Sequence, residues 1–581
     1  MRREIKSGKL ALKSSFVTAL FAFTSLALAQ DAGPYSAETI YFGGNILTMS
    51  GDAPSYAEAV AVRDGKIIKV GSKTSVSQLS DRSTRMVDLA GKTMLPGFID
   101  AHGHAWMTGF QKLSANLLPP PDGKGTDIPT LVSLLKEWQG KNRVAVDKVG
   151  WIIGFGYDDS QLAEKRHPTA ADLDQVSTEI PIVIIHQSSH LASMNHKALE
   201  LAGITSASAN PAGGVIRRMP DGHTPDGVLE EMAFFAPMFK VLGSFDKDVS
   251  EDIALAGADY YAQFGFTTAQ EGRASKQITQ TWQKLADEGR LKIDVAAYPD
   301  LQAERSFMEE IGVQKVYRNH FRVAGIKLSL DGSPQGKTAW LSTPYAHAPA
   351  GQPADYRGYP AIPDNDDLQS LVNQAFKNDW QVLAHTNGDA ASDALINAVA
   401  VAEKEYGKSD RRTAMIHAQT VREDQLDRMK QLGIVPSFFS MHTFYWGDWH
   451  RDETLGHERA IRISPTQSAL KRGMWFTEHH DAPVALPSSI MILHTTVNRT
   501  TRSGAVLGDE QRVDPYIALK SITDWASRQY FEDNNKGTIS VGKLADLVIL
   551  DKDPTKVDPA AIRDIQVLET IKEGQTIYSQ H

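Results

Sequence analysis

The sequence predicts an α/β protein: a parallel (β/α)8 TIM-like barrel with a small β-sandwich formed from both chain ends and an insertion after the first barrel strand. Three observations lead to this prediction. Strand-like apolar runs alternate with helical patterns along the middle, both ends hold short β segments, and the middle holds more strand-like runs than the eight a barrel needs. The expected division is 1–29 as a leader, 30–93 and 536–581 as the sandwich, and 94–535 as the barrel, with an insertion at 105–250.

The β character of the two ends is local and regular. Short β segments are expected at 39–42, 45–49, 59–63 and 66–70 in the first part, and at 537–541, 545–551 and 567–578 in the second. Asp64-Gly65 is a hairpin signal, and Glu573-Gly574 marks a second turn. Two β-rich ends around a long middle favour one sandwich built from both. Two unrelated β caps are the alternative.

Apolar runs in the middle of the chain have the length and composition of buried strands. They are 94–100, 151–156, 181–187, 264–270, 292–298, 322–330, 381–386, 413–417, 434–439 and 474–480. The pair 151–156 and 181–187 is in excess of a barrel. We therefore expect about 105–250 to be an insertion in the first βα connection, forming a lid or pocket wall. A long helix is expected at Val513–Phe531, where the chain leaves the barrel.

The first 29 residues have the pattern of a secretory signal peptide. Basic residues precede an apolar run from Phe16 to Leu28, and Ala27-Leu28-Ala29 is a small-residue cleavage site. Cleavage after Ala29 is expected, which would place the mature protein in a periplasm or outside the cell. A membrane anchor is the alternative, but the run is short for a span.

Charge and cysteine content restrict the partners. Removing residues 1–29 takes away five basic residues and one acidic one, so the formal charge changes from −9 to −13. An acidic protein is a poor partner for nucleic acid or an anionic membrane, and a small-molecule substrate is expected instead. The sequence has no cysteine. Any metal must therefore be bound by histidine, carboxylate or a modified lysine.

The stretch Leu95-Pro-Gly-Phe-Ile-Asp-Ala-His-Gly-His104 ends a predicted strand with two histidines. Residues i and i+2 of a strand point to the same side, so His102 and His104 face one point in space. Two neutral imidazoles that converge make half of a transition-metal site.

Further candidate ligands stand at the ends of later strands. Lys327 lies inside 322–330, His385 ends 381–386, His417 ends 413–417 and Asp481 follows 474–480. In a (β/α)8 barrel, reactive groups gather at the carboxyl ends of the strands, so these side chains are expected to meet. A lysine in an apolar strand is costly to bury unless it is paired or modified.

Each candidate also has a structural interpretation. His385 or His417 alone could be a satisfied core histidine, and Asp481 could cap a helix, since Ala-Pro follows it. Lys327 could pair with a carboxylate such as Glu271 and stay unmodified. Their joint occurrence at strand ends favours the metal site.

The L-P-G-F-I-D-A-H-G-H stretch resembles the first-strand signature of the amidohydrolase superfamily. The segments I-K-L-S-L-D-G-S-P-Q-G, V-L-A-H-T-N-G-D, M-I-H-A-Q and H-D-A-P-V resemble its amidohydrolase family 3 branch, which includes the N-substituted formamide deformylases. The resemblance runs from about residue 38 to the C-terminus. It implies the barrel with its β-sandwich, and homodimers are frequent among such relatives.

The resemblance also implies a ligand set. A carboxylated Lys327 would bridge two divalent ions, with zinc as the default. One ion would take His102, His104 and Asp481, and the other would take His385 and His417. If Lys327 is unmodified, Glu271 is the substitute ligand.

The chemistry expected of such a site is hydrolysis of an amide-like C–N bond by a metal-activated hydroxide. Asp481 would take the proton of the attacking water and deliver it to the leaving amine. Small N-acyl or N-formyl compounds are the expected substrates. A deaminase, or a hydrolase of lactones, esters or carbamates, is the alternative on the same site. A non-catalytic ligand-binding or regulatory protein is the alternative from another class, and the full ligand set argues against it.

Several residues are expected to shape the substrate pocket. His190, in the insertion, is predicted to touch the substrate carbonyl, although it could be an ordinary loop histidine. Predicted substrate-binding residues are Asp331, Ser333, Trp340 and His480, although Trp340 could equally belong to the core of the lid, which is the preferred interpretation. The sequence Glu478-His-His480 departs from the small residues that relatives usually carry before the aspartate. Either histidine could change metal occupancy.

Overall fold

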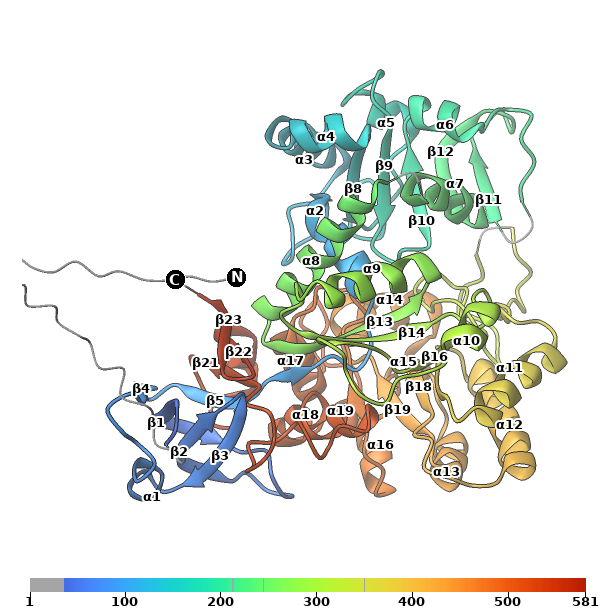
Figure 1. The fold of residues 1–581 in the computed structure, drawn as a ribbon. Helices are drawn as coiled ribbons and strands as arrows, with labels where there is room; N and C mark the ends of the chain where they lie inside the picture. The colour runs from blue at the N-terminus through green and yellow to red at the C-terminus, as the bar shows by residue number, and fades with distance from the viewer. Residues whose placement is uncertain (1–35, 212–213, 244, 350, 581) are drawn as a thin grey trace, which may run out of the picture.

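The structure is a computed structural model that describes residues 36–211, 214–243, 245–349 and 351–580. The predicted signal peptide lies outside these residues. Figure 1 shows a β sheet from the two chain ends (blue and dark red), a central α/β region, and a second α/β region above it in cyan and green. Within the described ranges, no helix has both the length and the apolar character needed to cross a membrane.

Strands from both chain ends form one eight-stranded sheet in the order β23-β22-β21-β5-β1-β2-β3, with β4 paired to β1. Its strands are β1 (Thr39–Leu47), β2 (Tyr56–Arg63), β3 (Lys66–Gly71), β4 (Arg85–Asp88), β5 (Thr93–Pro96), β21 (Leu547–Leu550), β22 (Val567–Lys572) and β23 (Gln575–Ser579). The two ends meet where β21 runs antiparallel to β5. They are therefore parts of one unit and not two separate caps.

Both faces of this sheet bury apolar side chains, as the alternation of a strand requires. In β1, Ile40 packs with Ala59 and Ala61 on one face. The next residue, Tyr41, packs with Val60 on the other. Whether the unit is a two-layered sandwich remains a prediction.

The central region contains eight parallel strand positions. They are β6 (Phe98–Ile99), β13 (Phe266–Ala274), β14 (Asp294–Pro299), β15 (Phe321–Val323) continued by β16 (Gly325–Ser329), β17 (Gln381–Thr386), β18 (Ala414–His417), β19 (Val435–Phe438) and β20 (Thr477–Glu478). They form two sheets, β15-β14-β13-β6 and β16-β17-β18-β19-β20. A parallel bridge between Asp300 and Lys327 connects the two. This is the α/β arrangement expected of a (β/α)8 protein.

The first and last of these strands share no ladder in the described part of the chain. Two backbone hydrogen bonds connect the segments that follow them instead. Asp481 N donates to His102 O at 3.3 Å, and His104 N donates to Ala482 O at 2.9 Å. These bonds fasten the last strand end directly beside the two histidines of the first.

Helices surround the central strands (Figure 1). They include α9 (Lys276–Asp287), α10 (Arg305–Ile311), α11 (Asn365–Lys377), α12 (Asp389–Tyr406), α13 (Glu423–Leu432), α14 (Met441–Trp449), α16 (Thr466–Lys471) and α17 (Ser489–Asn498). The predicted long helix at Val513–Phe531 is wrong, because two short helices stand there, α18 (Pro515–Ser521) and α19 (Asp524–Gln529). The break at Ile522 frees its carbonyl oxygen to accept from Ile99 N at 2.9 Å, which ties the chain to β6.

Residues 115–231 form their own six-stranded sheet, in the order β11-β12-β10-β9-β8-β7. Its strands are β7 (Ala115–Asn116), β8 (Ile152–Tyr157), β9 (Ile182–His186), β10 (Leu191–Met194), β11 (Gly214–Arg218) and β12 (Pro225–Glu231). The runs 151–156 and 181–187 correspond to β8 and β9, so they belong to this sheet and not to the central strands. Its helices are α3 (Ile128–Lys141), α4 (Arg143–Val149), α5 (Ala170–Asp174), α6 (His196–Ala202) and α7 (Met232–Gly243).

Helices α2 (Ala105–Leu113) and α8 (Lys247–Gln263) connect this region to the central strands. Their backbones touch at two glycines. A Cβ on Gly109 would lie 1.8 Å from Ile253 O, and one on Gly257 would lie 2.1 Å from Ala105 O. Only glycine permits this approach, so the two helices leave the central region as one closely packed pair.

A buried ionic network joins the central strands to the end sheet. Asp294 begins β14, and its Oδ2 lies 2.5 Å from Nζ of Lys536 and 3.0 Å from Nζ of Lys572, a residue of β22. Its Oδ1 lies 2.8 Å from Nδ1 of His320. Lys536 also lies 2.9 Å from Oε2 of Glu532. Because only 2–3% of the Asp294, Lys536 and Lys572 side chains is exposed, their charges depend on one another.

Candidate metal centre

Two histidines follow β6, and each is held by a hydrogen bond that sets its tautomer. His102 Nδ1 lies 2.6 Å from Oε1 of Gln270, and His104 Nδ1 lies 2.7 Å from Gly272 O. The Gln270 amide is oriented by its own donation to Ala101 O. Both acceptors are oxygens, so each Nδ1 carries the proton and each Nε2 keeps its lone pair. Burial lowers the pKa of His102 to about 3, so its ring is neutral at pH 7.

Asp481 faces these lone pairs. Its Oδ1 lies 3.3 Å from Nε2 of His102 and 3.4 Å from Nε2 of His104. Burial raises the pKa of Asp481, and hydrogen bonds from protonated His102 and His104 would lower it; with both Nε2 atoms unprotonated, a cation between the groups has to supply that stabilisation. An ionised carboxylate therefore faces two imidazole lone pairs, and this arrangement is favourable when a cation lies between them.

Asp481 does not cap a helix. Its backbone has φ +52°, and the chain after it continues as turns. The next helix, α17, is capped by Ser488, whose side chain accepts from Met491 N. The helix-cap interpretation is therefore wrong, and the carboxylate points into the cluster.

Lys327 lies in β16, almost fully buried, with Nζ 2.9 Å from Nε2 of His102. Burial lowers the pKa of this lysine to about 7. Within the described residues, no carboxylate lies within ion-pair distance of it. The expected alternative partner, Glu271, is engaged elsewhere, since its Oε2 accepts from Trp106 N at 2.6 Å and from Trp282 Nε1 at 2.9 Å. Glu271 thus holds the start of α2 and is not an ion-pair partner of Lys327.

His417 and His385 lie side by side, with ring centroids 4.4 Å apart. Nε2 of His417 lies 3.9 Å from Asp481 Oδ2. Both ring nitrogens of His417 are buried without a hydrogen-bond partner in the described chain, which costs about 1–3 kcal/mol per group if nothing binds there. One ligand atom each of His102, His417 and Asp481 fall within 4.8 Å of one another. The residues present therefore fit a metal ion.

The sequence predicted that Asp331 binds the substrate. This prediction is wrong, because the Asp331 side chain is buried and orients His385. Its Oδ1 lies 3.1 Å from His385 Nδ1 and accepts from Asn387 N, and its Oδ2 accepts from the backbone N of Trp340 and Gly388. No part of its side chain is exposed. The bond to Nδ1 leaves the lone pair of His385 on Nε2, where Asn387 Nδ2 lies 3.3 Å away.

We expect Asp331→Ala to lower metal affinity roughly 10- to 100-fold, since carboxylates behind ligating histidines have effects of that size. Competition with a chelator of known affinity would measure this. Asp331→Asn keeps the shape and two acceptor positions and should lose less. Equal metal affinity in Asp331→Ala and the unmodified protein would show that Asp331 is purely structural.

Alternation along a strand places the side chains of Glu478 and His480 on one side and that of His479 on the other. Both Glu478 oxygens accept from Ser440, through its backbone N at 3.0 Å and its Oγ at 2.6 Å. His480 turns away from the cluster, since its Nδ1 accepts from Ala482 N and its Nε2 faces Asp100. The predicted substrate contact of His480 is therefore wrong.

His479, one of the two histidines that the sequence left open as able to change metal occupancy, lies beside the cluster. Its ring centroid lies 5.2 Å from that of His102 and 5.1 Å from that of His417. Both of its nitrogens are buried without a partner in the described chain. His479 and Asp481 are two residues apart, so strand alternation could have assigned both to the inner side and His480 to the outer.

The other three predicted pocket residues, His190, Ser333 and Trp340, differ in how far their side chains are buried. His190 Nδ1 lies 2.9 Å from Oε2 of Glu231, and a quarter of the His190 side chain is exposed. Ser333 Oγ is buried and has no partner in the described residues. Trp340 contributes its backbone N to Asp331, while its ring packs partly buried on the core. His190 and Ser333 therefore remain candidates for substrate contact.

A second histidine–carboxylate group lies in the inserted sheet. Nε2 of His186 lies 3.1 Å from Asp159 Oδ1 and 3.7 Å from Asp158 Oδ1, while Nδ1 lies 2.8 Å from Ser188 Oγ and 3.0 Å from Ser188 N. Burial lowers the pKa of His186, but the two carboxylates outweigh it and raise the pKa to about 9. Neutral or charged, the ring keeps its proton on Nε2. No lone pair faces the carboxylates, so this group is an ion-pair cluster and not a metal centre.

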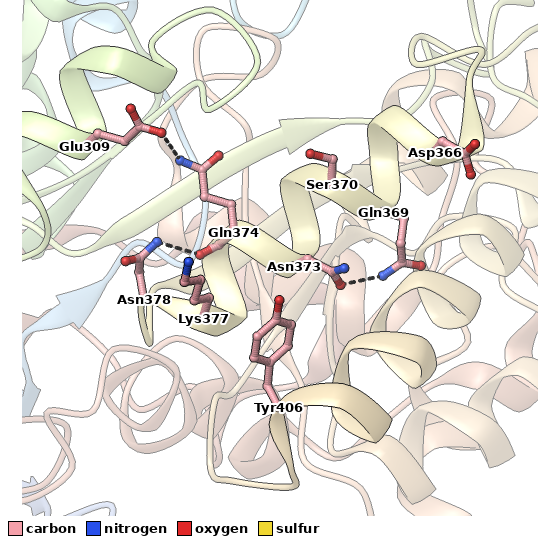
Figure 2. Close-up of a pocket in the computed structure, with 9 residues that line it drawn as sticks. All are labelled: Glu309, Asp366, Gln369, Ser370, Asn373, Gln374, Lys377, Asn378 and Tyr406. Atoms are coloured by element: carbon pink, nitrogen blue, oxygen red, sulfur yellow. Dashed lines mark hydrogen bonds between the residues drawn. The ribbon is translucent and has the colours of Figure 1, made fainter.

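Figure 2 shows a polar hollow on α10, α11 and the end of α12. Its side chains bond to one another, as from Gln374 Nε2 to Glu309 Oε1 and from Gln369 Nε2 to Asn373 Oδ1. The hollow contains no histidine and none of the candidate ligands. It therefore has no part in the site at the strand ends.

Comparison with known proteins places this geometry in a family. Residues 85–578 match the model of the amidohydrolase family. The chain belongs to the amidohydrolase family. It is thus a hydrolase acting on carbon–nitrogen bonds other than peptide bonds, and the resemblance noted in the sequence is confirmed.

Related proteins cover nearly the whole chain. The N-substituted formamide deformylase of Arthrobacter pascens is 25% identical over 538 residues, 90% of this chain and 96% of that protein. Protein LONG AFTER FAR-RED 3 of Arabidopsis thaliana is 29% identical over 565 residues, 93% of this chain and 92% of that protein. The crystal structure of an uncharacterized metal-dependent hydrolase from Pyrococcus horikoshii aligns with a TM-score of 0.71 at 24% identity, covering 94% of this chain and 100% of that one. The last similarity supports the fold of this amidohydrolase.

Proposed function

We propose that this amidohydrolase cleaves the C–N bond of a small N-acyl or N-formyl amide with two divalent metal ions. The observation that carries the proposal is the convergence of an ionised Asp481 and the Nε2 lone pairs of His102 and His104 beside a buried Lys327. The name of the Arthrobacter relative, a deformylase of N-substituted formamides, supports the same bond class.

The ions are proposed to be zinc, with a carboxylated Lys327 among the residues that would hold them. His102, His104 and Asp481 would hold one ion, and His385 and His417 would hold the other. Bound there, the ions would lower the pKa of a water molecule and polarise the substrate carbonyl. The absence of a carboxylate at ion-pair distance from Lys327, within the described chain, supports the modification, because the buried amine then has only His102 Nε2 within hydrogen-bond reach.

The protein's own groups move the protons. Asp481 is ionised, so it can accept a proton from the attacking water and return it to the leaving amine nitrogen. His190 is proposed to donate a hydrogen bond to the substrate carbonyl. Burial lowers the pKa of His190, but Glu231 outweighs this and raises it, which favours the protonated ring. Glu231 also fixes the ring by its contact with Nδ1.

The same ligand set would serve a deaminase, or a hydrolase of lactones, esters or carbamates, because the pocket and not the metal site decides the substrate. A non-catalytic binding protein would not need Asp481 and Lys327 together. We further propose that the protein is exported, since its first 29 residues match a signal peptide. Self-association as a dimer is part of the same proposal.

The test is hydrolysis by the zinc-loaded mature protein. N-formyl and N-acetyl derivatives of alkyl, aryl and amino-acid amines would be offered beside adenosine-type amines and simple lactones, with release of amine, ammonia or acid as the readout. Release of primary amine from the N-acyl set, abolished by a chelator and restored by zinc, is the expected result. Ammonia release or lactone opening alone would favour the alternatives.

A further inference from the structure

Arg273 stands at the rim of the metal centre, and the mechanism above does not use it. It follows Gly272, whose carbonyl oxygen holds Nδ1 of His104. Gly272 itself packs so closely on His102 that an added Cβ would lie 2.8 Å from Cε1 of that ring. Arg273 therefore directly follows a glycine that contacts two candidate ligands, His102 and His104.

The Arg273 backbone has φ +55°, a conformation that residues other than glycine seldom adopt. Such strain of order 1 kcal/mol persists where the surroundings require the side chain to point in one direction, and it often marks functional sites. Here it directs the chain from β13 toward the neighbouring strand end, where Asp300 lies.

Asp300 fixes one edge of the guanidinium. Its Oδ2 lies 3.0 Å from Nε of Arg273. Asp300 is the residue whose backbone pairs with Lys327, and only 13% of its side chain is exposed. By contrast, 53% of the Arg273 side chain is exposed. Among the described residues, no hydrogen bond engages its two terminal nitrogens, so the other edge of the fork is open.

The guanidinium stands at the carboxyl ends of β13 and β14, because Arg273 lies near the end of β13 and Asp300 directly follows β14. The candidate metal ligands gather at the same end of the central strands, which is where a substrate would lie.

We infer that Arg273 binds an anionic group of the substrate, and that the substrate class is N-acyl amino acids or similar amides with a carboxylate near the scissile bond. A guanidinium fork with one edge fixed and one edge open matches a carboxylate in a bidentate geometry. In a protein of formal charge −9, a fixed cation at the site gives anions a local advantage. This inference rests on the proposed hydrolysis of N-acyl amides and names its substrate.

The experiment uses a matched substrate pair, N-formyl-leucine and N-(3-methylbutyl)formamide, which differ only by the carboxylate. We expect the zinc-loaded protein to prefer the acid by about 10-fold or more in kcat/KM. Arg273→Met should reduce kcat/KM for the acid roughly 100-fold, mainly through KM, because the substrate carboxylate loses its charged partner. The same variant should leave kcat/KM for the neutral formamide within about 3-fold of the unmodified protein. Arg273→Lys should retain part of the preference. Arg318→Met, at an exposed arginine paired with Asp287, is the control for loss of one positive charge.

A binding readout separates this inference from the proposed function. N-methyl-leucine and N-methyl-3-methylbutylamine lack the formyl carbonyl of the scissile amide and cannot be hydrolysed, so calorimetry reports recognition alone. Tighter binding of the acid that disappears in Arg273→Met supports the inference even if neither formamide is cleaved. Equal binding of the two probes by the unmodified protein, or an equal loss on both substrates in Arg273→Met, would overturn it.

Discussion

Replacing Asp481 with asparagine will lower kcat/KM by about 1,000-fold or more, while the protein remains folded. Asparagine has nearly the same shape, so the turn at φ +52° and the packing around it can persist. The negative charge that faces Nε2 of His102 and His104 is lost, and so is the group that accepts and returns the proton. One substitution thus removes both proposed roles of Asp481, as a metal ligand and as a proton carrier.

Activity on an N-acyl amide, metal content and the unfolding midpoint should be measured together for Asp481→Asn. Loss of activity and of metal with an unchanged midpoint is expected. Asp366→Asn, at an exposed residue of the polar hollow in Figure 2, is the matched control and should retain full activity. Near-normal turnover of Asp481→Asn would exclude Asp481 from the chemistry.

Replacing Lys536 with methionine will destabilise the protein by about 3 kcal/mol, because breaking a buried ion pair leaves a charge without its partner. Lys536 contacts Asp294 at 2.5 Å and Glu532 at 2.9 Å, and both carboxylates are almost fully buried. Urea unfolding would measure the loss. Lys315→Met, at an exposed lysine 3.6 Å from Asp379, should change stability by less than about 0.5 kcal/mol.

The double variant Lys536→Met with Asp294→Asn should recover part of the loss, since the coupled charges are then removed together. Burial raises the pKa of Asp294, but Lys536 and Lys572 outweigh it and hold that pKa well below its ordinary value. The carboxylate therefore stabilises the fold fully above its unfolded-state pKa of about 4, and the contribution disappears as pH falls through the depressed folded-state pKa. No recovery in the double variant would mean that the two residues act independently.

The sequence predicted the parts of this structure that depend on local periodicity. Alternation along a strand placed His102 and His104 on one side, and the carboxyl-end rule brought His385, His417 and Asp481 toward them. The same rule, applied to the last strand, selects His479 and Asp481 for the inner side and His480 for the outer side.

Partners that are distant in the sequence could not be predicted. Asp331 holds His385 across 54 residues, and Glu271 holds Trp106 across 165 residues. Both carboxylates looked available in the sequence because nothing local shows which backbone donors the fold brings to them. The break in the helix predicted at Val513–Phe531 has the same origin. The carbonyl oxygen of Ile522 accepts from Ile99 N, and Ile99 lies in the first strand of the barrel, far from Ile522 in the sequence.

Metal content per chain of the freshly purified mature protein tests the central claim most directly. About two divalent ions per chain, lost on chelation together with amidase activity and regained on adding zinc, is the predicted result. A carbon-13 signal of a lysine carbamate that is absent in Lys327→Ala would accompany it. A protein that binds no divalent ion, and has no activity after zinc or manganese is added, would contradict the account.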